Sequence, residues 1–227
     1  MKKKFSTELA YLLGIATIAF GVSWMEAADF GVSMIVAPAY LVYLKMSQIL
    51  PFFTFGMAEY LFQAVLLILL CALLRRFRVS FLFSFATAVF YGFVLDGMMF
   101  LASFLPREGF AARSVLYIGG MVFGSIGVAL IFKTYISPEV YELFVKELSL
   151  KLGKPIPAVK TAYDCVSCVL GVVLSFAFFG FGIFEGVKLG TILCALINGR
   201  MIGAVSAWLD KTFAFYDALS LRKYFEK

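Results

Sequence analysis

A few ionisable and amide side chains interrupt long apolar stretches, and they are the first candidates for chemistry. In the first half these are Glu26, Glu59, Gln63 and Asp96, with Asp29 close by. A charged group at the centre of a membrane helix costs about 2.5–3.5 kcal/mol on insertion scales, so each one requires a reason. Together they predict an acidic outer vestibule that attracts a cation or an amine and binds protons. The alternative, preferred for Asp29, is that side chains near the ends of a span reach interfacial water.

Three further polar residues lie inside the last two apolar stretches. Asp164 is about two turns into one stretch, and Asn198 and Arg200 lie past the middle of the next. Matching depths would allow Asp164 and Arg200 to form a buried ion pair, which relieves much of the cost of burying either charge. The predicted pair is either a clamp between two helices or part of a site for a substrate carboxylate.

Two cysteines, Cys165 and Cys168, have the spacing of a metal or redox pair and share a helical face. The chain contains no histidine to complete a typical zinc site. A Cu(I) site that adds thioethers is the weaker alternative, since cysteine and methionine are ordinary residues in apolar helices. The thioethers considered are Met25, Met57, Met98 and Met99. We therefore expect no resident metal or cofactor.

No motif of a nucleophilic triad, a phosphate loop or a dinucleotide site is present, so an enzyme is not expected. Hydrophobic residues make up 63% of the 227 residues, charged residues 15%, and the mean hydropathy is +0.96. A soluble domain of this composition would lack a polar surface. The net charge of +6 does not indicate nucleic-acid binding, because the basic residues flank the apolar stretches and form no continuous patch.

The apolar stretches fix the fold class. Each is about 17–25 residues long, enough to cross a hydrocarbon core of about 30 Å as a helix, the form that satisfies its own backbone groups in lipid. The six stretches are Glu8–Trp24, Met57–Leu74, Ser80–Leu101, Ser114–Phe132, Ala158–Phe181 and Val187–Leu209. The sequence predicts an all-α polytopic membrane protein whose residues 1–227 form one membrane domain. The run after Lys2–Lys4 is interpreted as a retained first span, because it is long for a signal peptide and no clear cleavage site follows.

Basic residues alternate between connections, which predicts the orientation. They cluster at Lys2–Lys4, at Arg75–Arg78, between Lys133 and Lys160, and after Lys211, whereas the other connections are poorer in them. The positive-inside rule then places both termini in the cytoplasm.

The chain also carries signs of an internal repeat. A shift of 106 residues brings Gly14 onto Gly120, Gly21 onto Gly127 and Pro51 onto Pro157. Repeat one covers about 8–101 and repeat two about 114–209. Three spans in each half place the second half upside down, an arrangement common in secondary transporters. The alternative is a duplication that stabilised a bundle without creating a pathway.

Each half contains a linker after its first span. In Ser137–Gly153, Ser137 is the predicted N-cap, Pro138 the first helical residue and Glu139 part of the first turn. Its apolar spacing predicts an amphipathic interfacial helix on the cytoplasmic side. The other linker, Gly31–Gln48, is nearly uncharged, and two interpretations stay open: it lies flat outside or enters the membrane as a re-entrant segment.

Two GxxxG patterns indicate where helices approach closely. They are Gly120 to Gly124 and Gly199 to Gly203. Such spacing allows tight backbone contact, and packing within the chain is favoured over the seam of a homodimer.

Several segments resemble one group of proteins. These are Asp29–Tyr40, Phe55–Gly56, Ser84–Phe85, Tyr91–Asp96 and Gly190–Ile192. They resemble the YczE/YitT-type group of bacterial integral membrane proteins, and the likeness covers most of the chain. The YitT-type members carry an additional C-terminal soluble domain, for which this chain is too short. The resemblance implies a multi-pass protein of the bacterial plasma membrane, and it implies little about a substrate because the group's activity is poorly defined.

Three functions remain open from the sequence. The first is a secondary transporter or permease for a small cationic or proton-coupled solute, working by alternating access. The second is a non-transporting membrane adaptor that docks a partner protein on Ser137–Gly153. The third is the substrate-capture subunit of an ATP-driven importer, although no coupling motif is recognisable.

Overall fold

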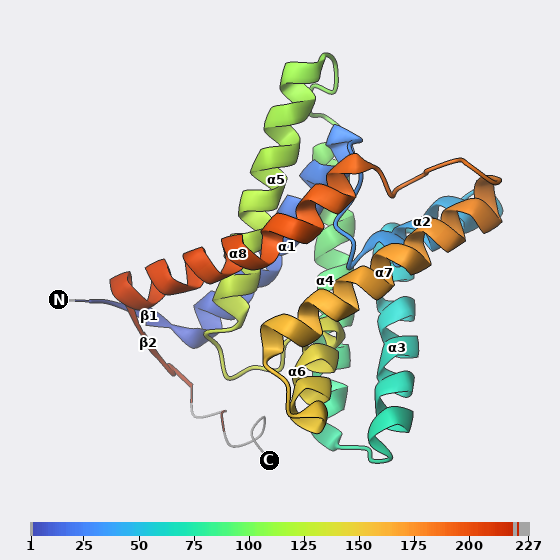
Figure 1. The fold of residues 1–227 in the computed structure, drawn as a ribbon. Coiled ribbons are helices and arrows are strands. Elements are labelled where there is room, and N and C mark those ends of the chain that lie inside the picture. Colours follow the sequence, from blue (N-terminus) through green and yellow to red (C-terminus); the bar gives the residue numbers. More distant parts are fainter. Residues whose placement is uncertain (1, 220–221, 223–227) are drawn as a thin grey trace.

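The fold is a bundle of helices with one pair of short strands. The computed structural model describes residues 2–219 and 222. Figure 1 labels its helices and strands, which are numbered in chain order. They are β1 (Lys3–Ser6), α1 (Thr7–Ala28), α2 (Ala37–Met46), α3 (Phe55–Leu74), α4 (Val79–Ala102), α5 (Phe110–Ile131), α6 (Val140–Leu152), α7 (Ile156–Phe179), α8 (Leu189–Thr212) and β2 (Phe213–Tyr216).

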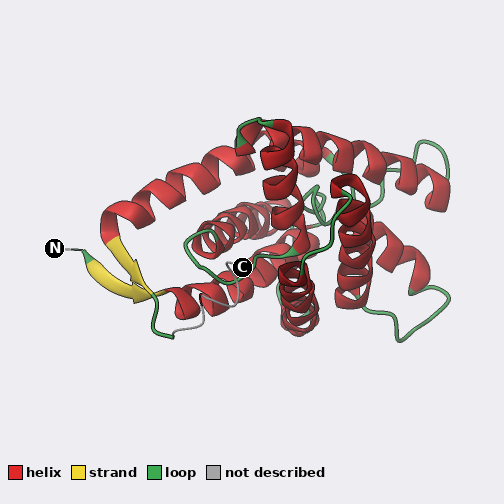
Figure 2. Cartoon of the chain, turned by 90° about the horizontal axis from the view of Figure 1, so that it is seen from below, coloured by secondary structure: helices red, strands yellow, loops and turns green. Residues whose placement is uncertain are grey.

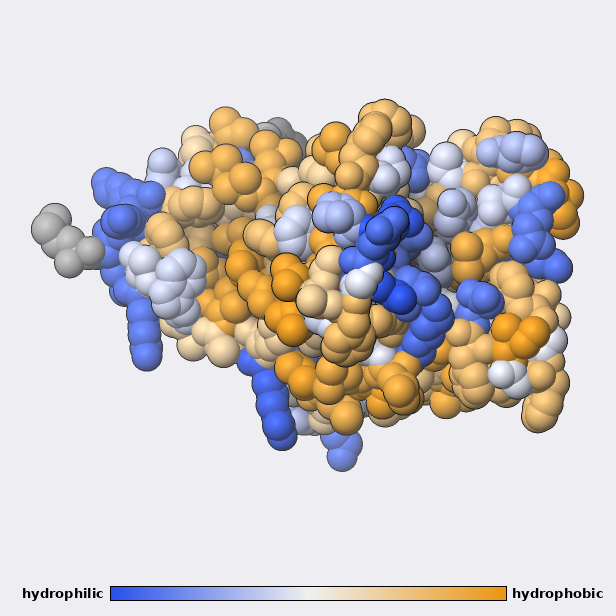
Figure 3. Space-filling model, turned by 90° about the horizontal axis from the view of Figure 1, so that it is seen from above, coloured by the Kyte–Doolittle hydropathy of each residue, from blue (hydrophilic) through white to orange (hydrophobic). Residues whose placement is uncertain are grey.

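In the part of the chain that the structure describes, six helices are long and apolar enough to cross a membrane: α1, α3, α4, α5, α7 and α8. With 10 and 13 residues, α2 and α6 are too short for this. Large apolar side chains such as Phe93 and Leu196 lie exposed on the outside, as lipid contact requires. Figure 3 shows hydrophobic surface over most of the face seen from above. The prediction of an all-α, six-span membrane protein is confirmed.

Glycines allow a close helix contact where α1 crosses α5. A Cβ atom on Gly21 would lie 2.6 Å from both the Gly120 oxygen and the Gly124 nitrogen. One on Gly127 would lie 2.6 Å from the Gly14 oxygen. Because no side chain fits there, the two backbones touch. The first GxxxG pattern, Gly120 to Gly124, therefore packs within the chain.

The second GxxxG pattern does not pack in this way. A Cβ atom on Gly199 or on Gly203 would meet nothing within 4 Å in the described structure. Both glycines lie on the exposed side of α8, because the contacts of α8 with α5 and α7 use its other side.

The remaining helix contacts come largely in corresponding pairs. Helix α1 packs on α4 as α5 packs on α8, and α3 packs on α4 as α7 packs on α8. The short helices pack both within their own half and across to the other, so that α2 lies on α3 and α7, and α6 lies on α7 and α3. Helix α6 also contacts α4, a contact without a counterpart among those described.

The two linkers enter the bundle. Ser33, Ile35 and Val36, which precede α2, line a cavity at the centre of the molecule. In the second linker, seven of the 13 residues of α6 are buried. An amphipathic helix lying loosely on the membrane surface would bury far fewer, so α6 is part of the bundle.

The start of α6 differs from the prediction. Its N-cap is Glu139, whose side chain makes no capping bond, and the helix begins at Val140. The expected N-cap, Ser137, lies outside the helix, and its carbonyl accepts a hydrogen bond from Thr87 of α4 at 2.9 Å. The local Ser-Pro-Glu pattern is overridden because Gln63 of α3 binds both the Glu139 carboxylate and the Val140 N–H.

A parallel pair of strands joins the start of α1 to the end of α8. Lys3 pairs with Phe213, and the register continues to Ser6 with Tyr216. The Phe5 ring packs against Phe213 at a centroid distance of 5.2 Å. Figure 2 shows the pair at one end of the molecule. The hydropathy pattern did not predict these strands.

Candidate functional site

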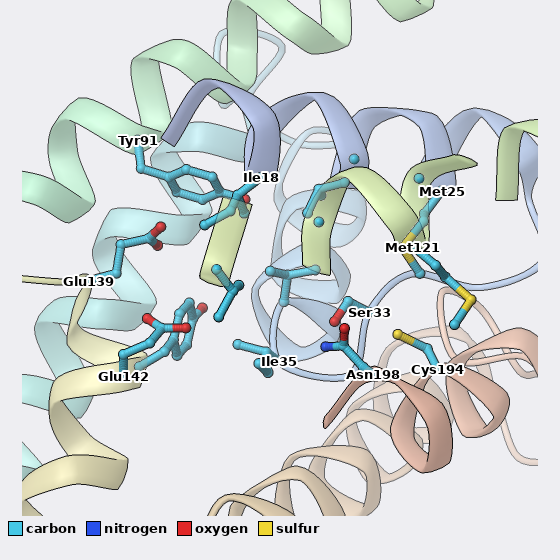
Figure 4. A pocket seen from close by; sticks show the side chains of 17 residues that line it. Ile18, Met25, Ser33, Ile35, Tyr91, Met121, Glu139, Glu142, Cys194 and Asn198 are labelled. Atoms are coloured by element: carbon cyan, nitrogen blue, oxygen red, sulfur yellow. The ribbon is translucent and has the colours of Figure 1, made fainter. Parts of the chain in front are cut away.

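A cavity of about 50 Å³ lies beside the α1–α5 crossing. Gly21, Gly120 and Gly124 form part of its wall, and a Cβ atom on Gly124 would meet nothing within 4 Å in the described structure. Figure 4 shows that polar side chains occupy its two ends. Glu139 and Glu142 lie at one end, and the other end holds Ser33, Cys194 and Asn198. Apolar side chains, including Ile35, lie between the two ends.

The carboxylate end is held by a buried hydrogen-bond network between α3 and the start of α6. Gln63 Nε2 donates to Glu139 Oε2 at 3.0 Å, and Val140 N–H donates to Gln63 Oε1 at 3.0 Å. The Tyr141 hydroxyl donates to Glu59 Oε2 at 2.9 Å. Glu59 and Gln63 are completely buried and Glu139 is 4% exposed. The network fixes the Glu139 carboxyl and joins the first half of the chain to the second.

Burial and mutual repulsion favour the protonated form of the cavity carboxyls. Burial raises the pKa of Glu139 well above its usual value, and the nearby charge of Glu142 raises it further. Burial also raises the pKa of Glu142, where the attraction of Lys160 offsets part of the rise. Lys160 itself pairs with Asp164 at 3.3 Å. One ammonium group therefore serves several carboxyl groups, and the site can take up a proton or a cation.

Two buried oxygen atoms at this end have no hydrogen-bond partner among the described residues. They are the hydroxyl of Tyr91, a residue 1% exposed, and Oε1 of Glu59. Tyr91 comes from α4 and lines the cavity near Glu139 (Figure 4). An unsatisfied buried polar group costs about 1–3 kcal/mol, and such groups in native proteins are normally paired. The Tyr91 hydroxyl therefore has its hydrogen-bonding capacity available to a water molecule or a ligand at this end.

The structure separates the acidic residues that the sequence grouped in one vestibule. Glu59 and Gln63 lie behind the carboxylate end of the cavity. Asp96 instead binds the start of α3, where Thr54 Oγ1 donates to it at 2.7 Å and Gly56 N–H donates at 2.8 Å. Asp96 thus acts as an anchor for a helix terminus, where a negative charge is favourable.

Glu26 and Asp29 lie at a second, smaller cavity of about 20 Å³. Glu26 pairs with Arg107 at 3.8 Å. Asp29 ends α1 in a left-handed conformation and pairs with Arg113 at 3.0 Å and with Lys188. These ion pairs connect the end of α1 to later parts of the chain.

The expected Asp164–Arg200 pair does not form. Asp164 pairs with Lys160, one turn earlier on α7, and Arg200 is exposed on α8. Equal depth in the membrane does not determine rotation about the helix axis, and the rotation of α8 turns Arg200 away from the bundle. Asn198, two residues earlier, faces inward and lines the cavity.

The cysteine pair does not form part of the cavity. Cys165 is exposed and Cys168 is half-buried, whereas Cys194 lines the cavity with Met25 and Met121. Within the described residues, no three His, Cys, Asp or Glu side chains are arranged to hold a metal ion.

Sequence reasoning missed the roles of Glu139, Glu142 and Tyr91. Glu139 was interpreted only as part of the first turn of a helix, and Glu142 was not considered. The available signal was the spacing of these two carboxyls: residues three apart share one helical face, and the surrounding face is apolar.

Comparison with known proteins gives a family and no activity. No curated protein and no solved structure matches the chain. The family model that matches does not name the YczE/YitT-type group, which stays a resemblance. That model covers residues 5–207, nearly the whole chain, and the protein therefore belongs to the family of unknown function DUF6198.

Proposed function

We propose that the protein is a secondary transporter that exchanges a small cationic solute for protons by alternating access. The observation that carries this proposal is the pair of carboxyls, Glu139 and Glu142, in a cavity between the two halves of the chain. We place it in a bacterial plasma membrane with both termini cytoplasmic, as the basic connections and the resemblance to the YczE/YitT-type group suggest.

The electrostatics of the cavity support proton exchange. Burial raises the pKa of both carboxyls, so the empty site favours protons. A bound cation lowers a carboxyl pKa by direct attraction, and the two ligands therefore compete. A site of this kind binds a cation when it opens to the less acidic side and releases it when it opens to the more acidic side.

The proposal includes an inverted repeat of the two halves, which corresponding contacts support. The shift of 106 residues places Gly14 on Gly120 and Gly21 on Gly127. A two-fold axis that exchanges the two halves would therefore turn the Gly14–Gly127 contact into a Gly120–Gly21 contact. Both contacts occur at the α1–α5 crossing. The corresponding pairs of helix contacts follow the same rule. Two inverted halves around a central site allow two equivalent states that open to opposite sides.

The alternative functions have less support. The adaptor hypothesis needed α6 as an exposed docking surface, and α6 is largely buried against α3, α4 and α7. A substrate-capture subunit would co-purify with an ATPase, which affinity purification from membranes tests directly.

Uptake into proteoliposomes tests the transport proposal. Radiolabelled guanidinium and sodium are suitable probes, because their permanent charge prevents passage through protein-free liposomes. We expect an acidic interior to drive uptake of at least one of them. The double variant Glu139→Gln, Glu142→Gln should lose this uptake, and Arg200→Gln, an exposed residue on α8, should retain it. The absence of uptake of both probes, or equal uptake by the double variant, would refute cation transport through this cavity.

A further inference from the structure

The two polar ends of the central cavity and its volume together indicate one class of ligand. We propose that the cavity binds a short primary amino alcohol, with the ammonium group at Glu139 and Glu142 and the hydroxyl group at Asn198. This assignment rests on the proposed function for its role as the transported solute, but the binding itself is testable separately.

The volume limits the size of the ligand. A position for one water-sized group takes about 10–15 Å³ of such a cavity. The cavity of about 50 Å³ therefore holds about three to five non-hydrogen atoms. Ethanolamine, with two carbons, one nitrogen and one oxygen, fits this limit, whereas a polyamine and every amino acid larger than glycine exceed it.

The carboxylate end matches a primary ammonium group. Such a group has three N–H donors and no acceptor. Glu139 has one oxygen bound to Gln63, which leaves the other for a ligand, and Glu142 contributes a second carboxyl. The orphaned hydroxyl of Tyr91, 1% exposed, supplies a third oxygen at the same end. Charge-assisted hydrogen bonds to these oxygens would satisfy the ammonium group and remove the unpaired hydroxyl.

The far end matches a hydroxyl group. Ser125 Oγ lies 3.0 Å from Asn198 Oδ1 and 2.8 Å from the Met121 carbonyl, and its single hydrogen can serve one of them. In either arrangement one of the two polar atoms of the Asn198 amide is hydrogen-bonded to Ser125. The other polar atom faces the cavity, where Figure 4 shows Ser33 beside Asn198. A hydroxyl both donates and accepts, so it pairs with either amide atom.

The middle of the cavity favours methylene groups and no second charge. Val22, Ile35 and Val128 line it with hydrocarbon. A diamine would place its second ammonium group beside Cys194 and Asn198, where the lining provides no carboxylate. An alkylamine of the same length would leave the Asn198 amide unpaired, and a site built to bind a hydroxyl rejects the analogue that lacks it.

Thermal unfolding of the purified protein in detergent tests the assignment with three matched probes. These are ethanolamine, propylamine (a methyl group in place of the hydroxyl) and ethylene glycol (no ammonium group). Ligands of this size bind no more tightly than about 10⁻⁵–10⁻⁴ M, so millimolar titrations are needed. We expect ethanolamine to stabilise the protein, propylamine to require about tenfold more, and ethylene glycol to have no effect.

Variants identify the two ends. Asn198→Ala should bind ethanolamine and propylamine equally, and the double variant Glu139→Gln, Glu142→Gln should bind neither. Arg200→Gln, on the exposed side of the same helix as Asn198, should behave as the wild type. Alkylation of Cys194 in the wild-type chain gives a readout that needs no variant, because a ligand in the cavity should slow it.

The outcomes separate this inference from the transport proposal. Equal stabilisation by ethanolamine and propylamine, or a preference that survives in Asn198→Ala, would overturn the ligand assignment while cation uptake still stands. Stabilisation by ethanolamine without uptake of any cation would keep the assignment and refute transport. If Asn198→Ala does not fold, slower alkylation of Cys194 with ethanolamine than with equimolar propylamine decides the matter, and equal rates overturn the assignment.

Discussion

Replacing Asp96 tests whether its carboxylate anchors the start of α3 or takes part in transport. The two oxygens of Asp96 accept from Thr54 Oγ1 at 2.7 Å and from Gly56 N–H at 2.8 Å, at the first turn of α3. Asp96→Ala removes both acceptors and leaves two donors unpaired. Asp96→Asn keeps the size and one acceptor oxygen but removes the charge that favours the helix N-terminus.

The structure sets the magnitude of the effect. A hydrogen bond to a charged group contributes about 1.5–3 kcal/mol. Asp96 is half-buried, so we take the lower figure for each of its two bonds, which gives a loss of about 3 kcal/mol for Asp96→Ala. For a chain of this length, 1 kcal/mol changes the melting temperature by about 2–4 °C. We therefore expect Asp96→Ala to lower it by about 6–12 °C, and Asp96→Asn by about half as much.

Fluorescence of Trp24 and Trp208 during heating in detergent measures this change. The control is Asp210→Ala, because Asp210 forms an ion pair with Lys133 and its side chain is 60% exposed. Exposed pairs contribute about 0–1 kcal/mol. If Asp96→Ala melts within 2–3 °C of this control (about 1 kcal/mol), the anchoring argument fails. If Asp96→Asn instead abolishes the response to ethanolamine, Asp96 belongs to the binding site.

Two further predictions concern the helix crossing and the cavity carboxyls. Gly21→Val should abolish folding or cost more than about 3 kcal/mol, since its Cβ would lie 2.6 Å from the Gly120 backbone; Gly97→Val, with nothing within 4 Å, should leave size-exclusion behaviour unchanged. Because burial raises the pKa of Glu139 above its unfolded value near 4.5, the folded state holds a proton that the unfolded chain releases, and melting temperatures should fall as the pH rises through and above 4.5. Glu139→Gln should reduce this slope, and an unchanged slope would contradict the burial of an ionisable group at that position.

The sequence predicts the helices because a membrane span depends on local properties. Length and hydropathy alone place α1, α3, α4, α5, α7 and α8 to within a few residues. The strand pair could not be predicted in this way. Lys3–Ser6 and Phe213–Tyr216 are ordinary sequences for the ends of spans, and they become strands because the fold brings them together.

The candidate site was predicted less completely because it depends on helix rotation and on tertiary contacts. Glu59 and Gln63 were found from their burial cost, but the partners of Gln63 lie 76 and 77 residues later in the chain. The Lys160–Asp164 pair was visible in the sequence as an (i, i+4) spacing, and the depth argument for Arg200 obscured it. Glu139 lies immediately before α6 because Gln63 of α3 binds its carboxylate. The sequence around Glu139 does not indicate that it lies outside the helix.

The strand pair has a consequence for biosynthesis. Thr7, the first residue after β1, donates a hydrogen bond to Asp217, which lies 210 residues later. At about 5–20 residues per second, the ribosome needs about 10–40 s to produce that partner. During this time the backbone groups of Lys3–Ser6 have no strand to pair with, while the helices that follow are being inserted. Closure of the two strands is therefore among the last steps of assembly, and protection of a backbone amide within Lys3–Ser6 from hydrogen exchange would report that the complete chain has folded.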